Sequence, residues 1–185
     1  MAADGGSTSR RGVPSVEFIE DVGAQLKAAD ETAESLVQAM EETHQKYRLM
    51  EAKLMAERTR LKGKLPELKN SLSQLSVLEE KQTAGETLRT RFGLSEQCFA
   101  LAEVPPTTKV SLWLGANVML EYGLEEARSL LTRNIAAAEK GVEALSRELD
   151  FIKDQMTTTE VNMARVYNYG VQQRKLQRPA ANNAS

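Results

Sequence analysis

Residues 131–166 read LTRNIAAAEKGVEALSRELDFIKDQMTTTEVNMARV, and their apolar side chains recur at alternating steps of four and three. One series falls every seven residues, at Leu131, Ala138, Leu145, Ile152, Thr159 and Val166. A second series interleaves with it, at Ile135, Val142, Leu149, Met156 and Met163. Sustained 4–3 spacing flanked by charged residues is typical of a coiled coil. The pattern predicts one long helix over about residues 124–175.

A second heptad pattern lies upstream, between about residues 30 and 81. Its main series, again spaced by seven, is Met40, Tyr47, Leu54, Leu61, Leu68 and Leu75. Asp30 is expected to cap this helix, and Gly63 and Pro66 predict a local kink. If the two helices pair antiparallel with Met40 opposite Val166, they begin and end together. The sequence therefore predicts a mainly α fold, a long antiparallel coiled-coil hairpin.

Glycine and proline divide the chain into five predicted parts. A disordered tail over 1–14 is followed by an N-terminal helical arm over 15–82, which starts with a short helical stretch at about 16–26. A β-hairpin assembly region covers 83–123, a C-terminal helical arm covers 124–175, and a second disordered tail covers 176–185.

Residues 83–123 carry short β-like runs bounded by turn residues, which predict two β-hairpins between the helices. A segment of this size does not bury enough surface to be stable alone. The hairpins are therefore expected to join an intersubunit β-barrel, with Cys98 as a buried strand residue. The expected assembly interface is apolar and consists of Phe99, Leu101, Val110, Leu112, Trp113, Leu114, Val118 and Leu120.

Composition argues against several classes of function. The net charge is −2 over 185 residues, so no overall field favours nucleic acid or a membrane surface. Cys98 is the single cysteine and His44 the single histidine, which gives no metal-ligand cluster, and His44 is expected on a solvated surface. No glycine-rich phosphate loop is present. We therefore predict no catalytic residue, no metal and no cofactor, hence a protein that is not an enzyme.

The location is also constrained. A lone cysteine fits a reducing compartment, and the sequence contains neither a signal-peptide core nor a run of about 18 apolar residues. These features predict a cytoplasmic protein, with a nuclear pool left open.

The order of long helix, β-hairpins and returning helix resembles that of prefoldin subunits, and the two-hairpin link resembles the α class. Two stretches are similar to eukaryotic members of the family: VPPTTKV at 104–110 with LWLGANVMLEY at 112–122, and DFIKDQMTTTEVNMARVYN at 150–168. The resemblance covers about residues 13–170.

The resemblance implies a heterohexameric co-chaperone whose other members are one further α-class and four β-class prefoldin subunits. It also implies capture of non-native proteins, chiefly actin and tubulin, and their transfer to the cytosolic chaperonin without ATP hydrolysis by prefoldin. The implied partners include neither nucleic acid nor a membrane.

Capture of unfolded chains requires reversible apolar contact, which flexible side chains such as methionine suit. The candidate client-binding residues lie toward the free ends of the two arms: Val37, Met40, Tyr47, Val161, Met163, Val166, Tyr167 and Tyr169. Met40, Met163 and Val166 also follow the heptads, so plain packing is the competing interpretation. Two other functions stay open, a structural coiled-coil tether and an RNA-binding helical arm that uses the basic run at 58–64.

Overall fold

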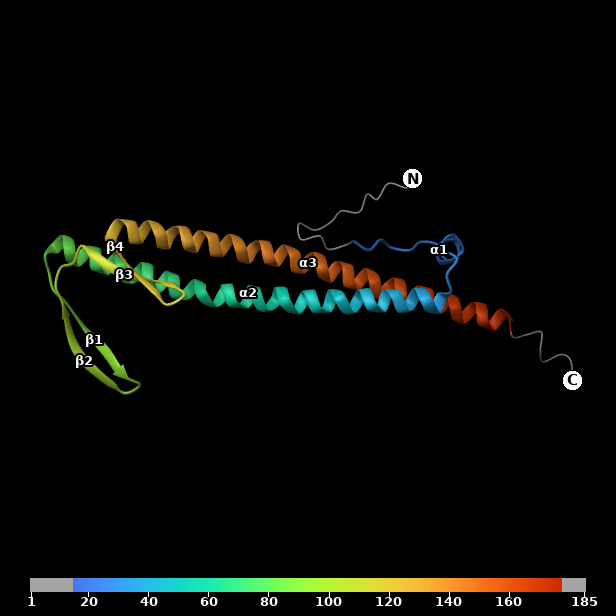
Figure 1. The fold of residues 1–185 in the computed structure, drawn as a ribbon, viewed down its shortest axis with the longest axis horizontal. Coiled ribbons are helices and arrows are strands. Elements are labelled where there is room, and N and C mark those ends of the chain that lie inside the picture. The colour runs from blue at the N-terminus through green and yellow to red at the C-terminus, as the bar shows by residue number, and fades with distance from the viewer. Residues whose placement is uncertain (1–14, 178–185) are drawn as a thin grey trace, which may run out of the picture. The chain divides into compact units, whose positions relative to one another are not determined.

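The computed structural model describes residues 15–177 of the chain, and most of these residues are helical. The elements follow one another as α1 (Val22–Ala29), α2 (Ala33–Ala84), β1 (Leu88–Ser95), β2 (Cys98–Val104), β3 (Lys109–Gly115), β4 (Val118–Gly123) and α3 (Leu124–Gln177) (Figure 1). The two predicted long helices and the two hairpins between them are confirmed. The predicted tail over 1–14, and residues 178–185 of the other tail, lie outside the described residues.

The start of the N-terminal arm differs from the expectation. Helix α1 begins only at Val22, after Asp21, whose carboxylate accepts a hydrogen bond of 3.0 Å from the Ala24 N–H. Asp30 does not cap α2, because it has a left-handed backbone (φ 52°) and ends α1. Thr32 takes that role, since its Oγ1 accepts a hydrogen bond of 3.2 Å from the Ser35 N–H.

Helix α2 runs without interruption past Gly63 and Pro66. Proline inside a helix removes one backbone hydrogen bond, yet here the helix continues on both sides of it. The two residues therefore do not divide α2 into separate helices.

The chain forms two compact units. One contains residues 15–58 together with 144–177, and the other contains residues 59–143. Helices α2 and α3 each contribute to both units.

In the first unit, α2 and α3 pair antiparallel around a buried seam. Its most enclosed apolar side chains, each at most 1% exposed, are Tyr47, Leu149, Ile152 and Val166. The predicted register places residue 44 opposite 162 and residue 34 opposite 172. The observed ion pairs join His44 to Glu160 at 2.9 Å and Glu34 to Arg174 at 2.6 Å. The partner of His44 lies two residues before the predicted position, and the partner of Glu34 lies two residues after it. The two offsets cancel, so the predicted register is confirmed.

In the second unit, a cluster of Leu75, Leu124, Ala127 and Leu131 forms the core between α2 and α3. The β3–β4 hairpin packs against this cluster through Val110, Leu112 and Tyr122. These three residues share one face of the hairpin, because Val110 pairs with Tyr122 and strand side chains alternate between faces.

Ion pairs between the helices also stabilise the second unit. Arg128 on α3 holds Glu79 on α2 with two hydrogen bonds, one of them 3.0 Å from Nε to Oε1. This contact lowers the pKa of the Glu79 carboxyl below its usual value. Lys69 and Glu139 form a further pair at 2.8 Å, two residues from the predicted register.

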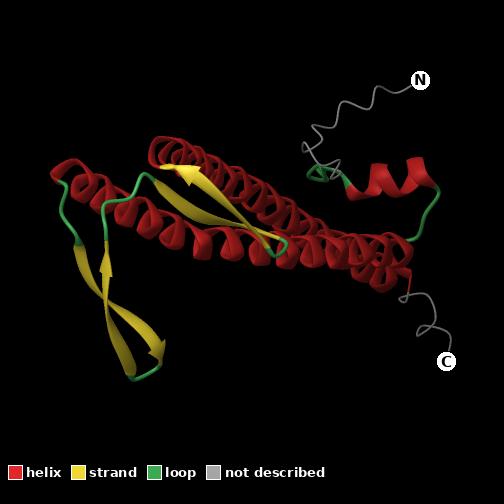
Figure 2. Cartoon of the chain, turned by 60° about the vertical axis from the view of Figure 1, so that its left-hand side comes forward, coloured by secondary structure: helices red, strands yellow, loops and turns green. Residues whose placement is uncertain are grey.

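The hairpins form two separate two-stranded antiparallel sheets, β1–β2 and β3–β4 (Figure 2). The β3–β4 turn uses left-handed backbone at Ala116 (φ 48°) and Asn117 (φ 62°), a geometry that matches the twist of a two-residue hairpin. Each of the four strands therefore has one edge without a partner strand within its sheet.

Candidate functional site

The first candidate surface is formed by the exposed apolar side chains of the two hairpins. Strand β1 is exposed from Arg89 to Ser95, and β2 is exposed or half-buried throughout. The large apolar side chains that remain exposed are Phe92, Leu94, Phe99, Leu101, Trp113, Leu114, Val118, Met119 and Leu120. Leu101 is 87% exposed and Trp113 is 60% exposed. A group of exposed apolar side chains of this size is unusual on a protein that has no binding partner.

The eight residues predicted for the assembly interface fall into two groups, two that pack within the chain and six that are exposed. Val110 and Leu112 pack on the helices of their own chain, so only part of their surface is available to a partner. The other six are exposed: Phe99, Leu101, Trp113, Leu114, Val118 and Leu120. Sequence reasoning missed Phe92, Leu94 and Met119. The strict alternation of strand side chains would have separated Leu112 from its outward neighbour Trp113, which pairs directly with Met119.

Cys98 corrects a prediction. Its side chain is exposed rather than buried. The reason is physical: nothing in the described residues covers the β1–β2 hairpin, so its alternating apolar residues have no second layer to pack against.

The second candidate surface is a groove where α2 begins and α3 ends. It has a volume of about 210 Å³ and is lined by Ala33, Glu34, Val37, Tyr167, Gly170 and Arg174. Tyr167 is 59% exposed. The helices approach closely here, because a methyl group added at Gly170 would lie 3.0 Å from the Ala33 Cβ. The groove is thus apolar with a charged rim formed by the Glu34–Arg174 pair.

Not all predicted client-binding residues belong to this groove. Val37 and Tyr167 do, whereas Val161, although 43% exposed, is six residues from Tyr167 and about 120° away around the helix. Met40 and Met163 are half-buried. Tyr47 and Val166 are 1% and 0% exposed, which makes them packing residues in this conformation. Burial also raises the pKa of the Tyr47 hydroxyl.

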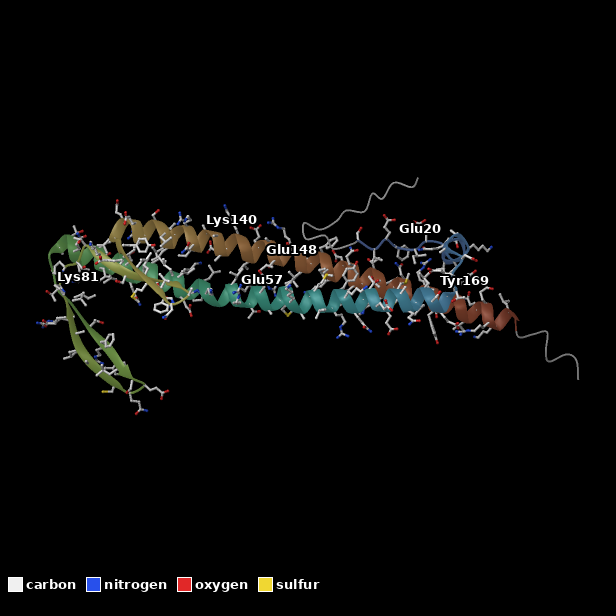
Figure 3. All side chains as sticks on the ribbon, viewed as in Figure 1. Glu20, Glu57, Lys81, Lys140, Glu148 and Tyr169 are labelled. Carbon is white, nitrogen blue, oxygen red and sulfur yellow. The ribbon has the colours of Figure 1, made fainter. Side chains whose placement is uncertain are left out.

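Tyr169 is half-buried beside α1 (Figure 3). A methyl group added at Gly23 would lie 3.0 Å from the Tyr169 hydroxyl oxygen. This residue therefore packs within the chain as well, together with the cluster of Ile19, Val22 and Val166.

His44 also differs from its prediction as a solvated surface residue. Its side chain is only 15% exposed, and Nε2 lies 2.9 Å from the Glu160 carboxylate. The residue is part of the pairing between α2 and α3. Among residues 15–177, no group of three His, Cys, Asp or Glu side chains is arranged to hold a metal ion.

A feature that sequence reasoning missed is the segment before α1. Residues Val16 to Glu20 run along α3 without helical turns and hydrogen bond to its side chains Gln155, Asn162 and Arg165 (Figure 1). Asn162 is 0% exposed, and its amide nitrogen and oxygen each hydrogen bond to this segment. An isolated asparagine in a helix has no periodic signal, so the sequence offered no way to find the contact.

Comparisons with known proteins bear directly on this architecture. Residues 47–169 match the family model described as Prefoldin subunit. Prefoldin subunit 3 of Homo sapiens is 44% identical over 185 residues, which cover 100% of this chain and 94% of that protein. The chain belongs to the prefoldin subunit family.

Prefoldin relatives from other organisms also match this chain over nearly its whole length. Probable prefoldin subunit 3 of Caenorhabditis elegans is 43% identical over 95% of both chains, and that of Schizosaccharomyces pombe is 38% identical over 91% of this chain and 96% of the relative. A chain from the cryo-EM structure of filamentous PFD of Methanocaldococcus jannaschii shares the fold, with a TM-score of 0.50 and 22% identity over 61% of this chain and 91% of that chain.

Family membership gives the two surfaces a context. Prefoldin subunits are chaperone components and assemble with other prefoldin subunits, and among residues 15–177 the β1–β2 hairpin and the outward face of β3–β4 have no covering layer. Within residues 15–177, no helix is long and apolar enough to cross a membrane.

Proposed function

We propose that the chain is an α-class subunit of a cytoplasmic heterohexamer, with one further α-class and four β-class partners, that captures unfolded proteins without ATP. Its hairpins join a β-barrel shared between subunits, and the ends of its arms contact the client. Actin and tubulin chains are the proposed clients, and the cytosolic chaperonin is the proposed recipient.

The observation that carries the proposal is the exposed apolar surface on both hairpins. Two-stranded sheets with strands of six to eight residues have marginal stability on their own, and their free edges favour pairing with other strands. Partner strands would cover Leu101 and Trp113 and complete the sheets. The arms are then left to bind clients, as their exposed Tyr167 and Val161 allow.

The groove at the ends of α2 and α3 supports the client-binding part. It presents Tyr167 and Val37 beside polar rim residues, which suits weak and reversible contact with apolar segments of many sequences. Neither of the open alternatives, a tether or an RNA-binding arm, is favoured by a specific contact in the described residues.

The test uses the six-chain complex reconstituted with this chain and a chemically unfolded actin that aggregates on dilution. Wild-type complex should suppress aggregation in the absence of ATP. The Tyr167→Ser variant should suppress it less, with assembly unchanged. Leu49→Ser is the matched control, because Leu49 is 75% exposed on α2 outside the groove. Equal loss in both variants, or none in Tyr167→Ser, would exclude the groove as a contact; no suppression by wild type would exclude capture.

A further inference from the structure

The segment Val16–Glu20, here called the strap, is held on α3 by contacts to its main chain. The Val16 N–H donates to Gln155 Oε1 at 2.5 Å, and the Ile19 N–H donates to Asn162 Oδ1 at 3.0 Å. Asn162 Nδ2 donates to the Glu17 carbonyl at 2.8 Å, and Arg165 donates to the Glu20 carbonyl at 2.8 Å. Four main-chain groups of five consecutive residues are therefore bound by side chains of one helix.

The spacing of these side chains matches an extended peptide. Gln155 and Asn162 are seven residues apart, or about 10.5 Å along a helix. Val16 and Ile19 are three residues apart, or about 10 Å along an extended chain. The strap and α3 run in the same direction, because higher-numbered strap residues meet higher-numbered helix residues. Such a row of groups binds main chain of nearly any sequence that lacks proline at the donor positions.

Apolar contacts supplement the hydrogen bonds. Ile19 is 6% exposed and joins Val22 and Val166 in a cluster flanked by Leu36 and Met40. Phe18 points the other way and stays half exposed, with the Arg165 guanidinium 4.7 Å from its ring centre. The site thus encloses one apolar side chain in a cluster and leaves its neighbour exposed.

Asn162 provides two of the main-chain contacts at the centre of this site. Its amide is fully buried, and both the amide nitrogen and the amide oxygen bond to the strap. If the strap left without a replacement, water would reach the Asn162 amide and Asn162 would lose these two contacts. A second extended chain with an apolar residue at the position of Ile19 would restore them.

We infer that α3 carries an extended-peptide site around Asn162, which the strap occupies in the free subunit and an extended segment of an unfolded client occupies in its place. The inference rests on the proposed function and adds a mode of recognition to it. Asn162, Gln155 and Arg165 bind the main chain of the client, and one of its apolar side chains takes the place of Ile19 against Val22 and Val166. The strap then acts as a competitor that limits weak binding.

The experiment compares full-length chains in the reconstituted complex, with reduced and carboxymethylated α-lactalbumin as a permanently unfolded probe. The double variant Ile19→Ser, Val22→Ser weakens the strap but leaves α3 intact, so its dissociation constant for the probe should fall at least about threefold. Glu17→Gln is the matched control: its side chain is exposed and its carbonyl is retained, so affinity should not change. Asn162→Leu should weaken binding relative to the double variant when combined with it.

A second measurement tests the main-chain contacts by competition between a peptide and the probe. The peptide SVEFIEDV, which copies residues 15–22, should bind the complex that contains the double variant and displace the probe. The same peptide N-methylated at the isoleucine keeps every side chain but loses the N–H that Asn162 accepts, and it should not compete. Amide hydrogen exchange at Ile19 in the wild-type complex should accelerate when the probe is added.

The outcomes separate the two claims. Wild-type binding with unchanged affinity in the double variant would show that the strap is a fixed structural cover. Equal competition by both peptides would show that Asn162 does not recognise the main chain. Either result would overturn the inference alone. Absence of probe binding by every complex would overturn the proposed function and the inference with it. Peptide binding that does not displace the probe would place the client elsewhere and reject the shared site.

Discussion

Tyr47 is the largest fully enclosed side chain of the seam between α2 and α3 in its unit. Aromatic side chains in such positions bury much apolar area, and their removal leaves a cavity that the surrounding helices fill only in part. The stability of the arm thus depends strongly on single residues of the heptad, whereas the exposed residues beside them contribute little.

We expect Tyr47→Ala to lower the free energy of unfolding of the arm by about 3 kcal/mol. Urea unfolding followed by circular dichroism measures this change. Leu49→Ala, two residues away on the same helix and 75% exposed, is the control and should change it by less than about 0.5 kcal/mol. Similar effects of both substitutions would mean that the seam is not the core of this unit.

A substitution at Gly63, in the interior of α2, is expected to raise stability. A Cβ added there has no neighbour within 4 Å, and glycine inside a helix costs about 1 kcal/mol relative to alanine. Gly63→Ala should therefore stabilise the chain by roughly 0.5–1 kcal/mol, seen as a higher urea midpoint. A loss of stability would indicate that the helix needs the backbone freedom of glycine at this point.

Among the elements, the contact between α2 and α3 through Glu79 and Arg128 gives a pH dependence. The ionised carboxylate of Glu79 is favoured in the folded chain, so its pKa is lower there than in the unfolded chain. The resulting stabilisation is present above the unfolded pKa of about 4.3 and is lost as the pH falls through the folded value. The melting temperature of wild type should thus exceed that of Glu79→Gln at pH 7, and the difference should disappear as the pH falls to 3.

Glu80→Gln provides the control for that pH dependence, because the exposed Glu80 is adjacent on the same helix. Its unfolding profile should stay parallel to that of wild type across the same pH range. If Glu80→Gln also converged with wild type at acid pH, general charge and not the Arg128 contact would explain the effect.

Substitutions of inward-facing and outward-facing residues of the β3–β4 hairpin should have different effects. Trp113→Ser should weaken assembly of the complex without changing the helicity of the chain, because Trp113 is exposed and points away from Leu112. Leu112→Asp should loosen the hairpin from its own helices, since Leu112 packs on the cluster around Leu131. Size-exclusion chromatography measures the first effect, and near-ultraviolet circular dichroism of Trp113 measures the second.

The control for the hairpin variants is Glu96→Gln, an exposed substitution in the β1–β2 turn that should leave assembly intact. Full assembly by Trp113→Ser would contradict the proposal that this surface meets partner strands.

The sequence predicted the long helices, their register and both hairpins, because heptads and strand alternation are periodic and extend over many residues. It did not predict the strap. The position of Val16–Glu20 depends on Asn162 and Gln155, which are polar residues without a periodic pattern, at more than 130 positions' separation in the chain. Among the client-binding candidates, periodicity alone did not distinguish Tyr47 and Val166, which are enclosed, from Tyr167, which is exposed.

At the scale of the whole molecule, membership of the prefoldin family and the uncovered hairpins both indicate a chain that completes itself by assembly. Its apolar side chains include those enclosed within each unit and those exposed on the hairpins, which the proposed function assigns to contact with partner strands. The proposed function follows from that division, since the arms are free for client contact only if the hairpins are the site of assembly.

Native mass spectrometry of the complex isolated from cytosol through this chain tests that central proposal most directly. We expect a six-chain particle with one copy of this 20.5 kDa subunit and five other small prefoldin subunits. A homodimer, or a stable complex with one large folded protein or with RNA, would contradict it.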